Sequence, residues 1–377
     1  MYFFTFLLKN LLRRPARSLL TITGLAVAVG AVVSLVGVAT GFENSFMDIY
    51  NSRDVDIVVQ RAGKGTEKIT RGLPEDWGNE IAKVKGVKQV IGGLVDMISF
   101  EKQGLMGVVL NGWAPDCPLF NRLTIIQGRG LKEGDAGKTI IGRVLAANLN
   151  KHVGDTIEYY SQPYKIVGIY ESPIVFENGG AAILLKDQQN LMAKPNQISG
   201  YTVTVEKPMT DKEIETVRER IEALQPGSLE ATKSSDFVKG VQQIRVSQAV
   251  AWLTSAIALI IGAIGMLNTM IMSVFERTKE IGTLRAIGWK RSRIVKMVIG
   301  ESVLLSLGGA VVGSVAGVLL VKFLTHLPNA AGIVSGKVSA PVIAQGFLVA
   351  LIVGVSGSIY PALWSANLLP TEALRGK

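Results

Sequence analysis

The chain of 377 residues has few side chains suited to metal binding or acid–base catalysis. It contains one cysteine, Cys117, and two histidines, His152 and His326. These are too few for a thiolate zinc site, and a Ser-His-Asp triad has little material because the histidines fall in separate segments. A single cysteine also excludes an internal disulfide, so Cys117 is either a thiol that pairs between chains or, as we favour, a half-buried bystander. We therefore expect no metal site, no bound cofactor and no catalytic residue in this chain.

Two short motifs are partly similar to nucleotide-binding sequences. GDAGKT, at residues 134–139, ends like a phosphate loop, but Lys132 stands where that loop needs a glycine, and no strand-then-helix pattern surrounds it. LSLGG, at residues 305–309, is superficially similar to the signature of ATP-binding cassettes but lies inside an apolar segment. The sequence thus predicts that this chain does not itself hydrolyse ATP.

Two polar residues stand within long apolar segments, Asn268 and Glu301. An ionisable group inside a membrane is by default a candidate functional residue. A structural explanation is also available, and we favour it. Glu301 would pair with a cation of the basic segment just before it, and Asn268 would hydrogen-bond between helices at a subunit contact.

The elements that would carry these residues are membrane helices. The chain is 48% apolar and only 19% charged, with a mean hydropathy of +0.33, which is too hydrophobic for an ordinary soluble domain. A bilayer requires about 20 consecutive apolar residues in a helix. Four stretches meet or approach this length: residues 19–40, 246–275, 297–321 and 342–363. Each is rich in Gly, Ala and Ser, which allows helices to pack closely in lipid.

The positive charges predict the orientation of these helices. Lys9, Arg13, Arg14 and Arg17 precede the first stretch, which is too long for a cleaved signal peptide and is better explained as an uncleaved anchor. Residues 276–296 carry seven basic residues against two acidic ones. Because basic loops stay inside, both termini are expected in the cytoplasm and residues 41–245 outside. The net charge of +10 is then explained by topology, and no nucleic-acid partner is expected.

The outer region has the pattern of a mixed α+β domain. Residues 54–60 alternate like a strand, Pro74 is expected to open a helix, and Gly104 is expected to join two strands. Residues 201–206 predict a further strand, and Thr210 with Glu213 predicts a capping box at the start of the next helix. Between these parts, residues 114–190 hold short strand-like runs separated by Gly, Pro and Asn, which favours a β-rich insertion.

The predicted fold class is an α-helical membrane protein with four transmembrane helices and an α+β extracytoplasmic domain of two subdomains inserted between the first and second helices. The predicted organisation is a cytoplasmic amphipathic helix at 1–17, a first span at 18–40, an extracytoplasmic domain at 41–245, a second span at 246–275, a cytoplasmic coupling segment at 276–296, a third span at 297–323, a short outer loop at 324–341, a fourth span at 342–363 and a cytoplasmic tail at 364–377. Within the outer domain, 41–113 and 191–235 form the split unit, 114–190 the insertion and 236–245 a stalk.

The stalk rests on a long segment without strong helix breakers. Residues 236–275 contain no proline. Forty helical residues would extend about 60 Å, twice the roughly 30 Å of hydrocarbon. A single rod would connect the outer domain mechanically to the cytoplasmic loop. The alternative is a break near Gly240.

Three segments of the chain resemble one family. LLKNLLRRPARSLLTITGLAVAVGAVV at 7–33, NTMIMSVFERTKEIGTLRAIGWKRSRIVKMVIGES at 268–302 and YPALWSANLLPTEALRGK at 360–377 resemble permease subunits of ABC transporters of the MacB, LolC/LolE and FtsX type. IIQGRGLKEGD, IIGRVLAANLNKHVGDTI and YKIVGIYES resemble the periplasmic core domain of the same family. The resemblance covers nearly the whole chain, and its motifs are specific.

The resemblance implies a cytoplasmic coupling helix at about residues 276–288 that docks into a separate ATPase subunit. Ile281, Leu284 and Ile287 recur at helical spacing among charged residues, as in an amphipathic segment that fills a partner groove. A helix lying on anionic headgroups is the alternative. The residues assigned to ATPase coupling are Glu276, Arg277, Lys279, Glu280, Ile281, Leu284, Arg285 and Ile287. Lys9, Arg13 and Arg14 are assigned to the membrane surface.

The resemblance also implies partners and two alternative functions. The expected partners are the membrane, a dimeric cytoplasmic ABC ATPase that carries the ATP and Mg, and a second permease copy, with a homodimer expected. A periplasmic adaptor and an outer-membrane channel are further partners of such systems. In the favoured function, ATP hydrolysis moves the outer domain by mechanotransmission and extrudes an amphipathic cargo such as a lipoprotein, lipid, peptide or drug. In the alternative, an FtsX-like subunit activates an extracellular partner such as a cell-wall hydrolase. The chain lacks the ATPase domain of MacB, so we expect a split-subunit, non-catalytic permease of the plasma (inner) membrane.

Overall fold

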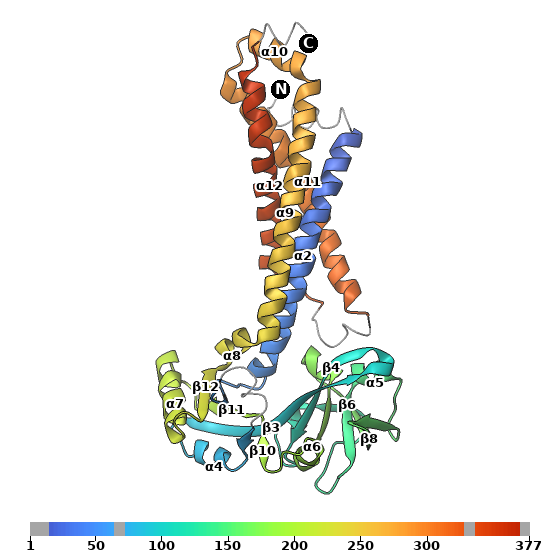
Figure 1. Cartoon of the computed structure of the whole chain (residues 1–377), viewed down its shortest axis with the longest axis vertical. Helices are drawn as coiled ribbons and strands as arrows, with labels where there is room; N and C mark the ends of the chain where they lie inside the picture. Colours follow the sequence, from blue (N-terminus) through green and yellow to red (C-terminus); the bar gives the residue numbers. More distant parts are fainter. Residues whose placement is uncertain (1–14, 64–71, 328–335, 370–377) are drawn as a thin grey trace. The chain divides into compact units, whose positions relative to one another are not determined.

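The computed structural model describes residues 15–63, 72–327 and 336–369. The chain divides into two compact units. One is helical and comprises residues 1–41, 246–323 and 336–377, and the other comprises residues 42–245 with 324–335. Figure 1 shows the helices of the first unit and the sheet of the second.

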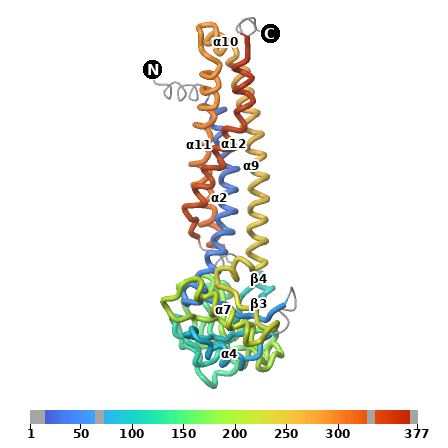
Figure 2. The backbone as a smooth tube through the Cα atoms, turned by 90° about the vertical axis from the view of Figure 1, so that its left-hand side faces the viewer, coloured from blue at the N-terminus to red at the C-terminus, as the bar shows by residue number. Residues whose placement is uncertain are grey.

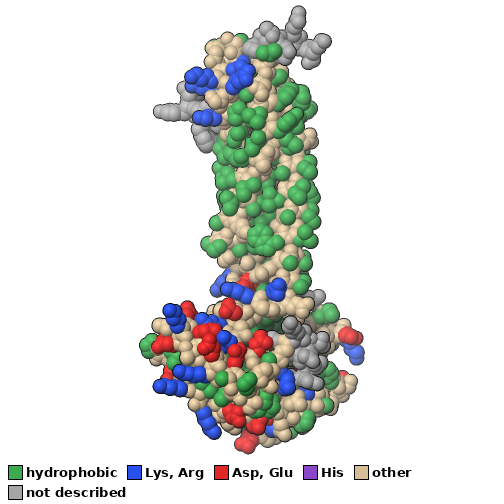
Figure 3. Space-filling view, turned by 60° about the vertical axis from the view of Figure 1, so that its left-hand side comes forward, with side chains coloured by type: hydrophobic (Ala, Val, Ile, Leu, Met, Phe, Trp, Pro, Cys, Tyr) green, Lys and Arg blue, Asp and Glu red, His purple; other side chains and the backbone are tan. Residues whose placement is uncertain are grey.

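The helical unit contains four helices that are long and apolar enough to cross a membrane. They are α2 (Pro15–Asn51), α9 (Gln242–Glu276), α11 (Arg291–Leu324) and α12 (Ala340–Asn367). Within this unit the four helices run side by side in two perpendicular views (Figures 1 and 2). Hydrophobic side chains are spread along the face of these helices that Figure 3 draws. The predicted fold class, four membrane helices with an α+β domain between the first and second, is confirmed.

Small residues bring these helices together. A methyl group added at Gly313 of α11 would lie 2.6 Å from the carbonyl oxygen of Ala26 in α2, and one at Gly354 of α12 would lie 2.3 Å from Oγ of Ser306. The hydroxyl of Ser302 donates a hydrogen bond to that of Ser358, at 2.8 Å. These contacts fit the Gly, Ala and Ser content of the apolar stretches, because small side chains allow the close backbone approach that packs helices in lipid.

The predicted single helix over residues 236–275 is wrong. The structure has α8 (Ser234–Gly240) and then α9, separated by Val241 in an extended conformation with φ −62° and ψ 120°. Gly240 and Val241 explain the break, because glycine and β-branched residues are poor helix formers. The predicted stalk at 236–245 is therefore two helical pieces.

The second unit is built on one large mixed sheet. Its strand order is β12-β1-β11-β3-β4-β9-β6-β8-β5, and β7 pairs with β8. The strands are β1 (Ile57–Arg61), β3 (Val87–Phe100), β4 (Leu105–Trp113), β5 (Thr124–Gly128), β6 (Lys138–Gly142), β7 (Thr156–Tyr159), β8 (Gln162–Glu171), β9 (Ala181–Leu184), β11 (Gly200–Val205) and β12 (Leu229–Lys233), with a separate pair of β2 (Leu73–Pro74) and β10 (Gln197–Ile198). The helices are α4 (Trp77–Ile81), α5 (Arg143–Leu149), α6 (Leu185–Leu191) and α7 (Asp211–Leu224), with short 3-10 turns η1 (Glu101–Gln103), η2 (Phe120–Arg122) and η3 (Val175–Gly179).

Strands β3 and β4 join the two halves of this sheet. One core includes Ile57, Val203 and Ile221, under α4 and α7. Another lies in the second half and includes Ile141 and Ile183. Because β4 pairs with β3 on one side and with β9 on the other, the sheet is continuous across the predicted boundary at residue 114.

The local expectations for this domain had mixed outcomes. Gly104 forms the turn between β3 and β4 with φ +68°, and the capping box of Thr210 with Glu213 is present. The prediction that a helix opens at Pro74 is wrong. Pro74 lies in β2, and the helix begins at Trp77. A proline can occupy this position because β2 is a two-residue strand that pairs with a single neighbour, β10.

Candidate functional site

The segment predicted to couple to an ATPase forms a short helix, α10 (Thr278–Ala286), between α9 and α11. Arg277 stands at the junction of α9 and α10. Its Nη1 donates hydrogen bonds to both carboxylate oxygens of Glu301 in α11, at 2.8 and 2.9 Å. Both side chains are largely buried, at 12% and 5% exposed. The start of α10 is therefore fixed to α11 by a buried ion pair.

The apolar positions of α10 face two different directions. Ile281 is 1% exposed within the core of the helical unit, and Leu284 packs against the same core. Ile287, just after the helix, is 73% exposed. The expectation that all three side chains are presented to a partner is therefore wrong for Ile281, which anchors α10 on its own bundle, whereas Leu284 is half-buried.

The charged residues of the segment divide in the same way. Lys279 and Glu280 are exposed, although Glu280 also accepts a hydrogen bond from Nε of Arg277 at 3.2 Å. Glu276 pairs with Arg17 of α2, with one contact at 2.7 Å. Arg285 is half-buried and donates from Nη1 to the carbonyl of Trp289 at 3.0 Å. The solvent-facing part of the segment is thus Lys279, Glu280 and Ile287.

The two intramembrane polar residues have different environments. Glu301 pairs with a cation of the basic segment, Arg277, as the structural explanation anticipated. Asn268 is exposed on α9, so within one copy of the chain it does not lie in a helix–helix contact. Lys9, Arg13 and Arg14, assigned to the membrane surface, lie outside the described residues.

The phosphate-loop-like motif at 134–139 is a structural turn leading into β6. Asp135 is held by Arg129 at 2.5 and 2.9 Å, by Nζ of Lys138 at 2.7 Å and by the backbone N–H of Lys132 at 2.9 Å. The Arg129 guanidinium, with Lys138 and Lys132, holds the pKa of this carboxyl well below its usual range. The lysine of the motif is therefore engaged with a carboxylate of the same turn.

Cys117 is buried in the outer domain, against the core that contains Trp113 and Leu119. Burial raises the pKa of its thiol. A buried thiol with a raised pKa is a poor nucleophile, so the structure favours the bystander explanation.

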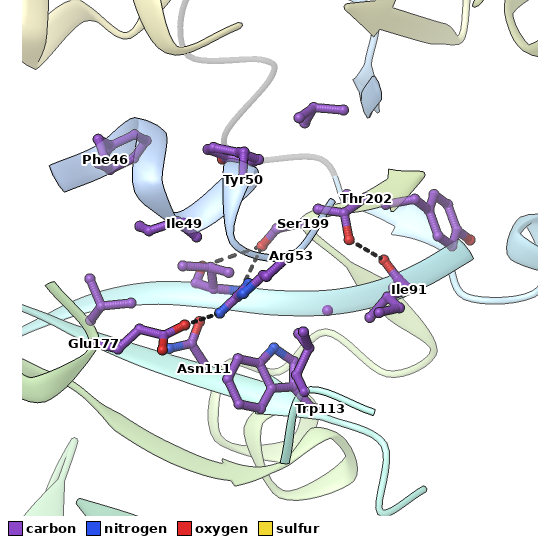
Figure 4. Close-up of a pocket in the computed structure, with 18 of the residues that line it drawn as sticks. Phe46, Ile49, Tyr50, Arg53, Ile91, Asn111, Trp113, Glu177, Ser199 and Thr202 are labelled. Atoms are coloured by element: carbon purple, nitrogen blue, oxygen red, sulfur yellow. Dashed lines mark hydrogen bonds and ion pairs between the residues drawn. The ribbon is translucent and has the colours of Figure 1, made fainter. Parts of the chain in front are cut away.

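Sequence reasoning missed a cavity in the outer domain. One face of the sheet forms its floor, with Val58 of β1, Thr202 of β11, Val95 and Met97 of β3, and Asn111 of β4. The end of α2 covers it, as Figure 4 shows for Phe46, Ile49 and Tyr50. Its volume is about 240 Å³. A sequence signal existed, because Phe42, Phe46 and Tyr50 recur every four residues and give α2 an aromatic stripe beyond its apolar span.

A buried ion pair lies at the side of this cavity. Arg53, just after α2, forms an ion pair with Glu177 of η3, and its guanidinium lies over the ring of Trp113 at 5.5 Å from the centroid (Figure 4). Glu177 also accepts a hydrogen bond from the hydroxyl of Ser172. Both charges are therefore compensated within the domain.

Comparison with known families agrees with both units. The model described as MacB-like periplasmic core domain matches residues 18–224, which is more than half of the chain, and the model described as FtsX-like permease C-terminal matches residues 252–370. The chain belongs to the ABC transporter permeases of the MacB/FtsX type.

Relatives of this permease come from archaea and bacteria. It is 28% identical to the uncharacterized ABC transporter permease MJ1507 of Methanocaldococcus jannaschii, over 99% of this chain and 97% of that one. It is 24% identical to the uncharacterized ABC transporter permease YknZ of Bacillus subtilis, over 98% and 97%. It is also 26% identical to the macrolide export ATP-binding/permease protein MacB of Brucella melitensis, over 95% of this chain, which spans 58% of the length of that protein.

A solved structure resembles part of the permease. The periplasmic region of MacB from Actinobacillus actinomycetemcomitans is 16% identical, aligns with 51% of this chain and 96% of its own, and has a TM-score of 0.38.

Proposed function

We propose that this permease works with a separate cytoplasmic ABC ATPase, in the plasma (inner) membrane with both termini in the cytoplasm, and converts ATP-driven movement of α10 into movement of the outer domain. The chain supplies no catalytic residue and binds no cofactor, and ATP and Mg are held by the ATPase dimer. The cargo is amphipathic, of the class that includes lipoproteins, lipids, peptides and drugs. A second copy of the permease completes the complex as a homodimer. A periplasmic adaptor and an outer-membrane channel are compatible additions.

The observation that carries this proposal is the attachment of α10 to its own bundle. Arg277 is paired with the buried Glu301, and Ile281 is buried in the helical core. A push on the exposed side of α10, at Lys279, Glu280 and Ile287, would therefore be transmitted to α11 and its neighbours rather than absorbed by a loose loop. A segment that only lay on lipid headgroups would not require this buried ion pair and this packing against the helical core.

The test is an affinity pull-down of the full chain from membranes solubilised in mild detergent. Ile287→Asp, Lys279→Glu and Glu280→Lys change the exposed side of the segment. They leave the pair of Arg277 with Glu301 and the buried Ile281 in place, although Glu280→Lys removes the hydrogen bond from Arg277. We expect an ABC ATPase to co-purify with wild type and to be lost from the triple variant. Met106→Asp, a change at a residue that is 79% exposed in the outer domain, is the matched control and should retain the ATPase. Retention of the ATPase by the triple variant would refute the docking role of this face.

The alternative function, an FtsX-like signalling subunit that activates an extracellular partner such as a cell-wall hydrolase, is favoured by the match of residues 252–370 to the FtsX-like model. The match of the outer domain to the MacB-like model favours export. Stimulation of the ATPase of the purified complex by a peptidoglycan hydrolase, and by no amphipath, would reverse this preference.

A further inference from the structure

We propose that the cavity in the outer domain is a binding site for a small uncharged amphipath that has an aromatic or short alkyl body and one hydrogen-bonding group. As a cargo site, it deepens the proposed function and rests on it. As a binding site, it rests on the outer domain alone, because its lining residues all fall between Phe46 and Phe237.

The shape and lining of the cavity suit an aromatic or short alkyl body. Aromatic side chains converge on it from α2, η3, α8 and the sheet, and several of their rings contact one another. The ring centroids of Phe46 in α2 and Phe176 in η3 lie 5.6 Å apart, and those of Tyr50 in α2 and Phe237 in α8 lie 5.7 Å apart. An apolar protein cavity of about 150 Å³ holds a benzene ring, so a volume of about 240 Å³ has room for a substituted ring.

The floor of the cavity carries exposed apolar side chains. Met97 is 53% exposed and Val95 is 46% exposed, although both lie on the same face of β3 at the cavity. Exposed apolar side chains that line a concave surface are typical of ligand sites.

The charged side chains of the cavity favour an uncharged ligand. The charged residues that line the cavity are Arg53 and Glu177, and they are paired with each other. A ligand with a net charge would find no free counter-charge there and would lose hydration on entry. An uncharged body would not pay this cost, and the ion pair would remain intact.

The cavity also offers a polar side chain to a ligand. The hydroxyl of Thr202 donates to the carbonyl of Ile91, and Ser199 exchanges hydrogen bonds with the backbone of Val95. Asn111 is half-buried at the cavity floor (Figure 4), and its side-chain amide makes no hydrogen bond to any residue in the described part of the chain. This amide offers a donor and an acceptor to one polar group of a ligand.

The site also explains how a ligand could be sensed. Phe46 and Tyr50 belong to α2, the helix that contains the first predicted span, and Phe237 belongs to α8. An occupant would contact these aromatic rings together with those of η3 and the sheet. Binding would therefore bear directly on the end of α2.

The experiment uses the full chain in lipid nanodiscs and two photoreactive probes. One is a benzyl alcohol that carries a trifluoromethyl diazirine, and the other is the matching benzoate. After illumination, labelled peptides are mapped by mass spectrometry, so labels on outer-domain residues are separated from those on membrane helices. We expect the alcohol to label the lining of the cavity saturably, and the benzoate to label it about tenfold less or weaker still, because its charge must be desolvated.

Met97→Trp is the decisive variant, because a larger side chain at this exposed position fills the cavity without disturbing a core. It should reduce labelling of the lining about tenfold, a change that corresponds to one decade in affinity. Met106→Trp is the control, since Met106 is also exposed, on β4, and does not line the cavity. Asn111→Leu should weaken labelling by the alcohol by about two- to tenfold, as expected for one hydrogen bond.

Labelling that does not saturate, or that is unchanged in Met97→Trp, would overturn the site. Equal labelling by the benzoate would overturn the assignment of an uncharged ligand. The pull-down described above tests the proposed function separately. Saturable labelling without ATPase association would leave the site standing and the permease mechanism refuted, whereas the reverse result would refute the site alone.

Discussion

The guanidinium of Arg277 and the carboxylate of Glu301 form a buried, two-pronged ion pair across 24 residues of sequence. It joins the start of α10 to α11. Glu301 lies in an apolar helix, where an unpaired carboxylate would be costly. This pair, with the burial of Ile281, links the charged segment to the membrane helices.

Removing one member of this pair should destabilise the helical unit. Arg277→Ala removes the cation that pairs with the buried Glu301 carboxylate, and such changes cost roughly 3–5 kcal/mol. Replacing both residues, as in Arg277→Met with Glu301→Leu, should recover much of the loss, because no buried charge remains. Thermal unfolding in nanodiscs measures both effects. Glu280→Gln, at an exposed partner of Arg277, is the control and should cost less than about 1 kcal/mol.

The two faces of the coupling segment should respond differently to truncation. Ile281→Ala removes a buried side chain and should lower the free energy of unfolding by about 2–5 kcal/mol. Ile287→Ala, at an exposed position, should change it by no more than about 0.5 kcal/mol while weakening ATPase binding. Parallel measurements of unfolding and of ATPase co-purification separate the two roles. Loss of stability in Ile287→Ala would contradict this division.

Two glycines in the membrane helices should tolerate a methyl group unequally. Gly313→Ala would place a carbon 2.6 Å from the carbonyl oxygen of Ala26, so α2 and α11 would have to separate. Gly265→Ala in α9 meets nothing within 4 Å and should be neutral or stabilising, because alanine favours helix by up to about 1 kcal/mol. Unfolding temperatures of the two variants in the same nanodiscs test the contrast. Equal tolerance at both positions would mean that the α2–α11 contact is looser than the structure has it.

The ion pair of the outer domain should be sensitive to the shape of its cation. Arg53→Lys keeps the charge but loses the planar group over Trp113 and the fit to Glu177, so the outer domain should lose stability by about 1–3 kcal/mol. Trp113 should also change its fluorescence, because the cation over its ring is displaced. Lys102→Arg, at an exposed turn, is the comparison and should leave both observables unchanged. Unchanged Trp113 fluorescence in Arg53→Lys would show that the Arg53 guanidinium does not lie over the Trp113 ring in solution.

The turn at Asp135 should make stability depend on acidity. The pKa of Asp135 is lowered in the folded protein, first by hydrogen bonds from Arg129, so the unfolded chain takes up the proton first as pH falls. The stabilisation from Asp135 is therefore complete above the unfolded pKa of about 3.9 and is lost progressively below it.

Asp135→Asn tests this dependence. The variant should be less stable than wild type at neutral pH, and the difference should shrink below about pH 4. Unfolding temperatures measured between neutral pH and pH 3 give the comparison. Asp116→Asn, at an exposed position, is the matched control. A difference that stays constant over this range would show that the carboxylate charge is not what holds the turn.

The sequence by itself determined the membrane helices and the place of the outer domain between the first two, and its motifs carried the resemblance to the family. The membrane helices depend on local composition, which acts wherever the segment lies in space. The capping box at Thr210 and the turn at Gly104 were also predictable, since both involve residues that are near neighbours along the chain. The sequence left open both a continuous helix and a break near Gly240. A glycine and a β-branched residue weaken a helix without excluding it.

Only the tertiary structure decided which faces of these elements are used. Ile281 and Ile287 have the same residue type and lie in the same segment, yet one is buried and the other exposed, because α10 packs on helices far away in sequence. The same holds for Arg53, Glu177 and Trp113, which come from separate parts of the outer domain and meet at one cavity. Long-range packing sets such contacts, and the periodicity of a single segment carries no record of its partner.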